Sequence, residues 1–417
     1  MMIVHLHGVL VGSLHQRASG GWDFSFAPSY WRQPARPVLS RSYEDVARTH
    51  VDFATEATGV PSFFGNYLPE RGSPLRELLS NQVGIDPTDD GALLGHLGED
   101  LPGAITVRVA PEDADPETVP PPPRRQRPTK HEPLRFSLAG MQLKFSVNRA
   151  GTGFTVPLRG LGGRWIAKLP HFEYAGVPGN EFAMLTLARA CGIVVPEFEL
   201  IPWRKIEALP DDLALREEDA LVLRRYDRAD DGTPIHQEDF AQVLGVSTAE
   251  KYPEGRASGK NTKLVLQFQH MGRLIRLLCG DDDFEAYLVR LTFMVLTGNC
   301  DAHLKNWSLV YPDRRNPRLA PAYDLVAVHA ISDSFRRLAL KLSEVREPHR
   351  VSARHLVRVA AFAGFSETRA REVVGTTVER FVAAWKKEGP GLPMSQAQAK
   401  RLDQYLRTLS LLRQPVG

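Results

Sequence analysis

Cysteine is scarce in this chain of 417 residues. The three cysteines, Cys191, Cys279 and Cys300, lie far apart and form no CxxC pair. So few cysteines in so long a chain exclude a fold held together by disulfides, which is typical of small secreted proteins. We therefore expect the protein to work in a reducing cytoplasm.

Long apolar runs and a signal peptide are also missing. No uninterrupted apolar stretch reaches the roughly 18 residues that a membrane-spanning helix needs. The N-terminus has no basic region ahead of its apolar stretch, and His5 and His7 interrupt that stretch, which is atypical of a signal peptide. The sequence therefore predicts a protein that does not associate with membranes.

The chain has little excess charge of either sign. Its 52 Lys and Arg residues against 49 Asp and Glu give a net charge of +3, which is below the usual signature of a dedicated nucleic-acid binder. Two basic stretches, 124–130 and 314–318, read better as solvated surface than as DNA contacts. Net charge alone identifies no partner.

The composition is that of a folded protein of two or three domains. Hydrophobic residues make up 43% and charged residues 24% of the chain, as in ordinary globular domains. Short strand-like runs dominate the first half, and apolar residues at helical spacing dominate the second. This order predicts an α+β fold of two lobes with a cleft between them, preceded by a small N-terminal α/β module.

Changes in pattern divide the chain into four segments. Residues 1–109 begin with a strand meander whose first turn lies at Gly8. Residues 110–133 are acidic, then rich in proline, then basic, and we expect a linker or mobile loop there. Residues 134–245 alternate strands with one helix that ends at Gly192. Residues 246–417 are mostly helical.

The segment TGNCDAHLKN carries the most informative pair of polar residues. Asp301 and Asn306 are five positions apart, the spacing of the Asp and Asn in the catalytic loop of protein kinases. Such an Asp accepts the proton of the attacking hydroxyl, and such an Asn ligates Mg²⁺. The alternative is a helix end at Gly298 with Asp301 as a turn residue.

Two further residues support the interpretation of Asp301 and Asn306 as a catalytic pair. Asp324 follows Asp301 by 23 residues, beyond a strand-like excursion, and could serve as a second Mg²⁺ ligand, because Mg²⁺ takes few protein oxygens beside phosphate. Lys168 lies among apolar residues in WIAKLP, where an ammonium group is costly unless it meets anions, and Glu181 is its candidate partner. The alternatives are a helix cap for Asp324 and an edge-strand lysine for Lys168.

The run FSLAGMQLKFSV is a weaker signal. Ala139 and Gly140 would let the backbone approach a phosphate, and Lys144 would add positive charge. One glycine does not make a phosphate-binding loop, so a hairpin bend remains open on composition.

Taken together, these motifs resemble the HipA-type toxin serine/threonine kinases of bacterial toxin–antitoxin pairs. The resemblance follows the chain in order, from the N-terminal meander through the S-x-A-G-x-Q-x-K pattern of residues 137–144 to IAKLP, RRYDR, HQEDFAQVLG, DAHLKN and AYDL. It implies a two-lobed protein-kinase-like fold with an N-terminal module and a mostly helical C-terminal lobe.

The resemblance also implies roles for individual residues. Asp301 takes the place of the catalytic Asp, Asn306 and Asp324 those of the metal ligands, and Ser137 that of the serine whose autophosphorylation expels the phosphate loop. The implied ATP-binding residues are Ala139, Gly140, Met141, Gln142, Leu143, Lys144, Lys168, Arg224, Arg225, Tyr226, His303, Leu304, Lys305, Asn306, Tyr323 and Asp324. One departure is Arg224, at a hinge position that is often acidic in relatives, which puts side-chain contacts to adenine in doubt there.

The implied activity is ATP- and Mg²⁺-dependent protein serine/threonine phosphorylation that arrests growth. The implied partners are a small helix-turn-helix antitoxin, through which the protein reaches DNA indirectly, and a target among the aminoacyl-tRNA synthetases. Two alternatives stay open: a small-molecule phosphotransferase, and a catalytically silent kinase fold kept as a corepressor with its antitoxin.

Overall fold

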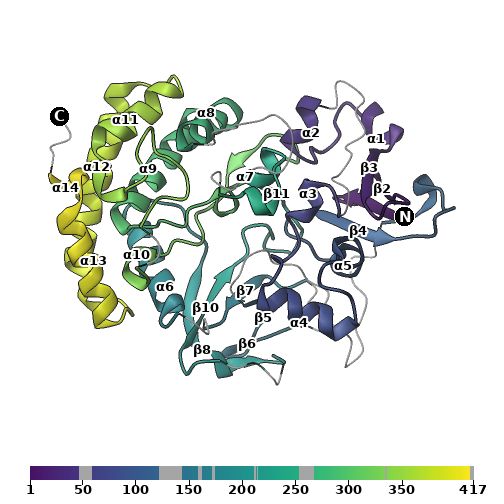
Figure 1. The fold of residues 1–417 in the computed structure, drawn as a ribbon, viewed down its shortest axis with the longest axis horizontal. Helices are drawn as coiled ribbons and strands as arrows, with labels where there is room; N and C mark the ends of the chain where they lie inside the picture. Colours follow the sequence, from purple (N-terminus) through teal and green to yellow (C-terminus); the bar gives the residue numbers. More distant parts are fainter. Residues whose placement is uncertain are drawn as a thin grey trace.

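The computed structural model has three parts, with the N-terminal module at one end and a helical lobe at the other (Figure 1). A strand-rich lobe lies between them in the chain. The described residues are 1–46, 59–121, 143–157, 162–170, 174–210, 213, 215–252, 267–333 and 336–413. Among these, no helix is both long enough and apolar enough to cross a membrane.

A four-stranded antiparallel sheet forms the base of the N-terminal module. Its strand order is β3-β2-β1-β4, with β1 at Met2–Leu6, β2 at Val9–Gln16, β3 at Trp22–Phe26 and β4 at Ile105–Val109. His7 and Gly8 join β1 to β2 with φ angles of 52° and 77°, which is the geometry of a tight hairpin turn. The predicted meander is confirmed, and β4 returns from a distance to pair with β1.

Five short helices lie among the described residues of this module. They are α1 (Pro28–Arg32), α2 (Arg41–Val46), α3 (Ser62–Gly65), α4 (Pro74–Val83) and α5 (Asp90–Leu97). The side chain of Ser73 accepts a hydrogen bond from the backbone of Arg76 and so caps α4, which ends at Gly84 in the left-handed conformation. Residues 110–121, the first half of the expected linker, lie against this module, because Ala114 and Val119 pack on Met1 and Ile3.

A six-stranded sheet and one helix form the strand-rich lobe. The strand order is β8-β10-β7-β5-β6-β9. The strands are β5 (Lys144–Ala150), β6 (Gly153–Thr155), β7 (Trp165–Lys168), β8 (Phe198–Pro202), β9 (Ile206–Glu207) and β10 (Asp219–Arg224), and the helix is α6 (Val177–Ala190). The single helix predicted before Gly192 is therefore confirmed.

The strand β10 is buried on both faces, which explains why residues 220–223 are all apolar. Side chains alternate between the two faces of a strand. Ala220 and Val222 join the core shared with the N-terminal module, whereas Leu221 and Leu223 join the core of α6 and the helical lobe. The sheet thus ties the three parts into one structure.

Helices predominate in the last part of the chain. They are α8 (Phe268–Cys279), α9 (Asp281–Thr297), α10 (Val328–Ile331), α11 (Ala353–Phe362), α12 (Glu367–Glu388), α13 (Gln396–Thr408) and α14 (Ser410–Arg413). A small sheet lies at the start of this lobe, made of β11 (His236–Asp239), β12 (Ser308–Tyr311) and β13 (Arg318–Leu319), with α7 (Phe240–Val243) directly after β11. This sheet brings the segment HQEDFAQVLG next to the loop that carries Asp301.

Candidate functional site

A pocket of about 480 Å³ lies between the two lobes, a volume typical of small-molecule sites. All three parts of the chain contribute to its lining. The predicted site residues that line it are Lys144, Lys168, Arg224, Arg225, Tyr226, Asp301, His303, Lys305, Asn306, Tyr323 and Asp324. Leu143 and Leu304 are outside the lining and pack into the two hydrophobic cores instead.

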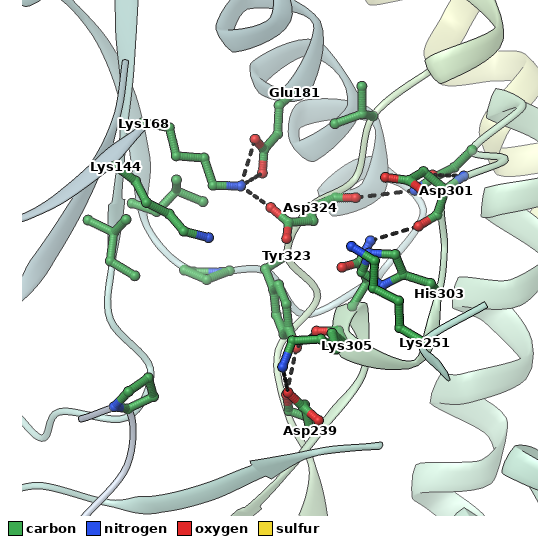
Figure 2. Close-up of a pocket in the computed structure, with 18 of the residues that line it drawn as sticks. Lys144, Lys168, Glu181, Asp239, Lys251, Asp301, His303, Lys305, Tyr323 and Asp324 are labelled. Carbon is green, nitrogen blue, oxygen red and sulfur yellow. Dashed lines mark hydrogen bonds and ion pairs between the residues drawn. The ribbon is translucent and has the colours of Figure 1, made fainter. Parts of the chain in front are cut away.

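Lys168 holds the polar centre of the pocket together (Figure 2). Its ammonium donates to the two carboxylate oxygens of Glu181 at 2.7 and 2.8 Å and forms an ion pair with Asp324. Burial lowers the pKa of Lys168, but the charges of Asp324 and Glu181 outweigh this and raise it. Lys168 is therefore a cation at neutral pH, and its predicted pairing with Glu181 is confirmed.

A second lysine stands directly across from the first. Lys144 on β5 is the register partner of Lys168 on β7, and its side chain is directed toward the space beside Asp324 (Figure 2). The pKa of Lys144 lies below its ordinary value, because the effect of burial outweighs the opposing effect of the Asp324 carboxylate. Like charges opposite each other destabilise a sheet, so this pair favours an anion in the pocket.

The loop after α9 places Asp301 and Asn306 at the pocket. The helix α9 ends at Gly298, which has a φ of 64°. The side-chain amide of Asn306 donates to the backbone oxygen of Asp301 at 2.9 Å, which closes the loop on itself. Burial raises the pKa of Asp301, and a hydrogen bond from Tyr252 opposes that rise.

Asp324 and Asn306 supply an oxygen donor set that suits Mg²⁺. Among the described residues no cluster of three or more His, Cys, Asp or Glu is placed to hold a metal. Mg²⁺ bound with nucleotide phosphates needs only one or two carboxylates from the protein. Asp324 has a left-handed backbone with a φ of 51°, and its side chain is 32% exposed, so its carboxylate reaches the pocket. The residues present therefore fit this ion.

The hinge residues engage partners other than a nucleotide. The backbone N–H groups of Arg224 and Arg225 donate to Glu197 and Arg164 at 2.8 and 2.9 Å. The Arg225 guanidinium is bound to Asp227. Apolar side chains such as Ile166 and Leu223 line the pocket here, so this region offers adenine apolar packing.

Lys305 has partners that sequence reasoning missed. Its ammonium donates to the backbone and side-chain oxygens of Asn66 at 2.8 and 3.0 Å and to Asp239 at 2.7 Å. These three acceptors match its three hydrogens, so Lys305 ties the N-terminal module to the loop of Asp301. Its predicted contact with phosphates stays a prediction. Next to it, burial lowers the pKa of His303 to about 3, which keeps that ring neutral.

Several other lining residues were not foreseen, among them four polar residues from outside the predicted motifs. Asn66 and Glu70 come from the N-terminal module, and Lys251 and Tyr252 follow α7; all four line the pocket. Their sequence context carries no catalytic motif, and only the packing of distant segments reveals them. In the other direction, Ser137 and Ala139, Gly140, Met141 and Gln142 lie outside the described residues.

Comparison with known proteins places the chain in a family. Residues 2–108 match the HipA N-terminal domain and residues 136–385 the HipA-like C-terminal domain. The putative kinase Y4dM of Sinorhizobium fredii is 39% identical over 99% of this chain and 97% of its own length. The chain belongs to the HipA family.

More distant HipA proteins agree with this assignment. The serine/threonine-protein kinase toxin HipA of Shewanella oneidensis is 26% identical over 85% of this chain and 81% of its own. The solved complex of HipA, HipB and operator DNA from Shewanella oneidensis contains a chain that matches with a TM-score of 0.70 and 21% identity, covering 98% of this chain and 96% of that one. The chain therefore has the two-lobed, kinase-like HipA fold that the sequence predicted.

Proposed function

We propose that this HipA-family protein is an ATP- and Mg²⁺-dependent serine/threonine protein kinase that acts as the toxin of a toxin–antitoxin pair. The observation that supports the proposal most is the group of Lys168, Glu181 and Asp324 beside Asp301 in one pocket. A paired lysine, a metal-binding carboxylate and a separate carboxylate for the acceptor are what phosphoryl transfer requires.

The residues divide the chemistry among them. Lys168 and Lys144 hold the phosphates, and Glu181 keeps Lys168 oriented. Mg²⁺, held by Asp324 and Asn306, would neutralise charge that develops on the transferred group. Asp301 accepts the proton of the attacking hydroxyl, and the neighbouring loop residues hold it at the pocket.

The proposed partners come from the family. The matched HipA of Shewanella oneidensis was solved with HipB and operator DNA, which supports a HipB-like helix-turn-helix antitoxin for this chain and an indirect route to DNA. An aminoacyl-tRNA synthetase is the proposed target.

Replacing Asp301 tests the activity. We expect Asp301→Asn to fold and to bind ATP, but to transfer phosphate on the order of 10² to 10⁴ times more slowly, which is the value of a positioned general base. Labelled ATP added to a cell lysate, followed by mass spectrometry, would identify the proteins that take up phosphate. Full activity of Asp301→Asn, or label found only on small molecules, would contradict the proposal.

Ser137 provides an internal readout of the same activity. We propose that the protein phosphorylates itself there, because residues 137–144 resemble the S-x-A-G-x-Q-x-K pattern of the family. The phosphate would add about −1.5 to −2 charges and would compete with ATP. Mass spectrometry should find phosphate on Ser137 in the wild type and none in Asp301→Asn. Phosphate in both proteins would indicate another kinase.

A further inference from the structure

A hydroxyl of the chain itself already lies at the proposed catalytic carboxylate. The Tyr252 hydroxyl donates a hydrogen bond to Asp301 Oδ1. The Tyr252 ring packs edge-on against His303, with centroids 5.1 Å apart and planes at 83°. A general base must hydrogen-bond to the proton it removes, and Tyr252 already occupies one of the two carboxylate oxygens of Asp301 that an acceptor hydroxyl could use.

The residue before Tyr252 anchors it to the N-terminal module. The Lys251 ammonium binds both carboxylate oxygens of Glu70 at 2.7 Å. The two side chains are only 11% and 14% exposed, so this ion pair is poorly screened by water. The same ammonium lies 5.3 Å from the centre of the Tyr252 ring. Glu70 therefore holds Lys251, and with it the adjacent Tyr252, at the pocket. Figure 2 shows Lys251 near Asp301.

Tyr252 can leave this position without disturbing the core. It is 37% exposed, whereas most aromatic side chains of the lobe are fully buried. Within the described part of the chain, the hydrogen bond of its hydroxyl is the one to the Asp301 carboxylate. Displacement by another hydroxyl replaces that bond with an equivalent one.

We infer that Tyr252 is an internal competitor of the phosphoacceptor: its hydroxyl occupies the acceptor position on Asp301 until a substrate hydroxyl displaces it. The inference rests on the proposed function, because it takes Asp301 as the base. In this role, Tyr252 controls the access of acceptor hydroxyls to Asp301. The N-terminal module takes part in this control, because its Glu70 holds Lys251, the residue next to Tyr252.

The variant Tyr252→Phe tests this, since it keeps the ring and removes the hydroxyl. Two quantities are measured: ADP release from Mg-ATP without acceptor protein, and label transfer to myelin basic protein at increasing concentration. We expect ADP release to rise and KM for myelin basic protein to fall, each by about three- to tenfold, the order expected for the net contribution of one typical hydrogen bond. The value of kcat should stay within about twofold.

Two further variants sharpen the result. Glu70→Gln loosens Lys251 and should shift both quantities in the same direction. Tyr30→Phe is the matched control: it also removes a tyrosine hydroxyl, which donates to Pro37 O at 2.5 Å in the N-terminal module, and it should leave both quantities unchanged.

The outcomes separate the inference from the proposed function. A lower kcat with unchanged KM in Tyr252→Phe would show that Tyr252 positions Asp301 and would overturn the competitor role. Unchanged ADP release and KM would overturn it as well. Label transfer that persists in Asp301→Asn would instead remove the proposed function itself. ADP release needs no acceptor protein, so the test does not depend on finding the substrate.

Discussion

The two carboxylates bound to Lys168 differ in their surroundings. The Glu181 side chain is 1% exposed, whereas that of Asp324 is 32% exposed. Glu181 therefore serves as the permanent counter-ion of the lysine, because an unpaired buried charge is strongly destabilising. Asp324 is the partner that can turn toward a metal ion. Although both acids contact Lys168, their different exposure therefore predicts different roles for them.

This difference predicts distinct effects of two substitutions. Asp324→Asn should fold and should bind ATP with the same affinity in the presence and absence of Mg²⁺, whereas wild-type affinity should rise with Mg²⁺. Glu181→Gln should instead lower the free energy of unfolding by about 3 kcal/mol or more. Calorimetric titration and urea denaturation measure these quantities, with the exposed Asp282→Asn as control. A wild-type response to Mg²⁺ in Asp324→Asn would contradict the metal role.

At the scale of elements, β11 brings a buried acid, Glu238, to the junction between the N-terminal module and the helical lobe. Glu238 accepts hydrogen bonds from the Ser40 hydroxyl at 2.5 Å, from the backbone of Arg41 at 3.1 Å and from the Tyr311 hydroxyl. Burial raises the pKa of Glu238 to about 7, with Asp239 adding to the rise. Since Ser40 and Arg41 belong to the N-terminal module, β11 joins that module to the helical lobe through this acid.

The raised pKa predicts how stability depends on pH. Below the ordinary glutamate pKa of 4.5, Glu238 is protonated in both the folded and the unfolded protein. It therefore adds no pH dependence to the stability there. As the pH rises to about 7, the unfolded chain ionises while the folded protein keeps the proton, so stability falls. At about 1.4 kcal/mol per pKa unit, the loss is up to about 3 kcal/mol.

Glu238→Gln removes this titration. Thermal unfolding of both proteins should show the wild type losing stability relative to Glu238→Gln as the pH rises from about 4.5 to about 7, with a constant difference above that. A difference that does not change with pH would mean that the pKa of Glu238 is the same in the folded and unfolded protein, which would contradict the raised pKa.

At the scale of the whole molecule, a buried ion cluster fastens the N-terminal module to the hinge. Arg228 donates to Asp100 and to the backbone oxygen of Gly103 at 2.8 and 2.9 Å. Asp227 accepts from the backbone of Gly103 at 2.8 Å and from Arg225. The segment RRYDR is therefore a docking point between parts of the chain, whatever its predicted part in nucleotide binding.

Breaking this cluster should weaken the whole structure. Arg228→Met leaves Asp100 buried with a charge that has lost its closest cation, and we expect a loss of about 3 to 5 kcal/mol in the free energy of unfolding. Arg204→Met is the matched control, because its ion pair with Glu217 is exposed, and it should leave the free energy of unfolding nearly unchanged. Equal effects of the two substitutions in urea denaturation would refute a structural role for the cluster.

The sequence by itself determined the features that depend on local pattern. Short strand-like runs predicted the meander of β1, β2 and β3, and helical spacing predicted α6 and the mostly helical segment that holds α9 and α12. The DAHLKN and AYDL motifs predicted a site around Asp301 and Asp324. These succeed because strand and helix periodicity act over a few residues, and because catalytic groups keep a set spacing within one loop.

Only the tertiary structure decided which distant residues meet. The pairing of β4 with β1, the contact of Lys305 with Asn66 and the contacts of Glu70 with Lys251 and of Tyr252 with Asp301 all join segments far apart in the chain. No local pattern encodes them, because a polar residue that will be buried reads the same in the sequence as one that stays in solvent. The packing of the N-terminal module against the lobes selects these partners, since each buried polar group must find one.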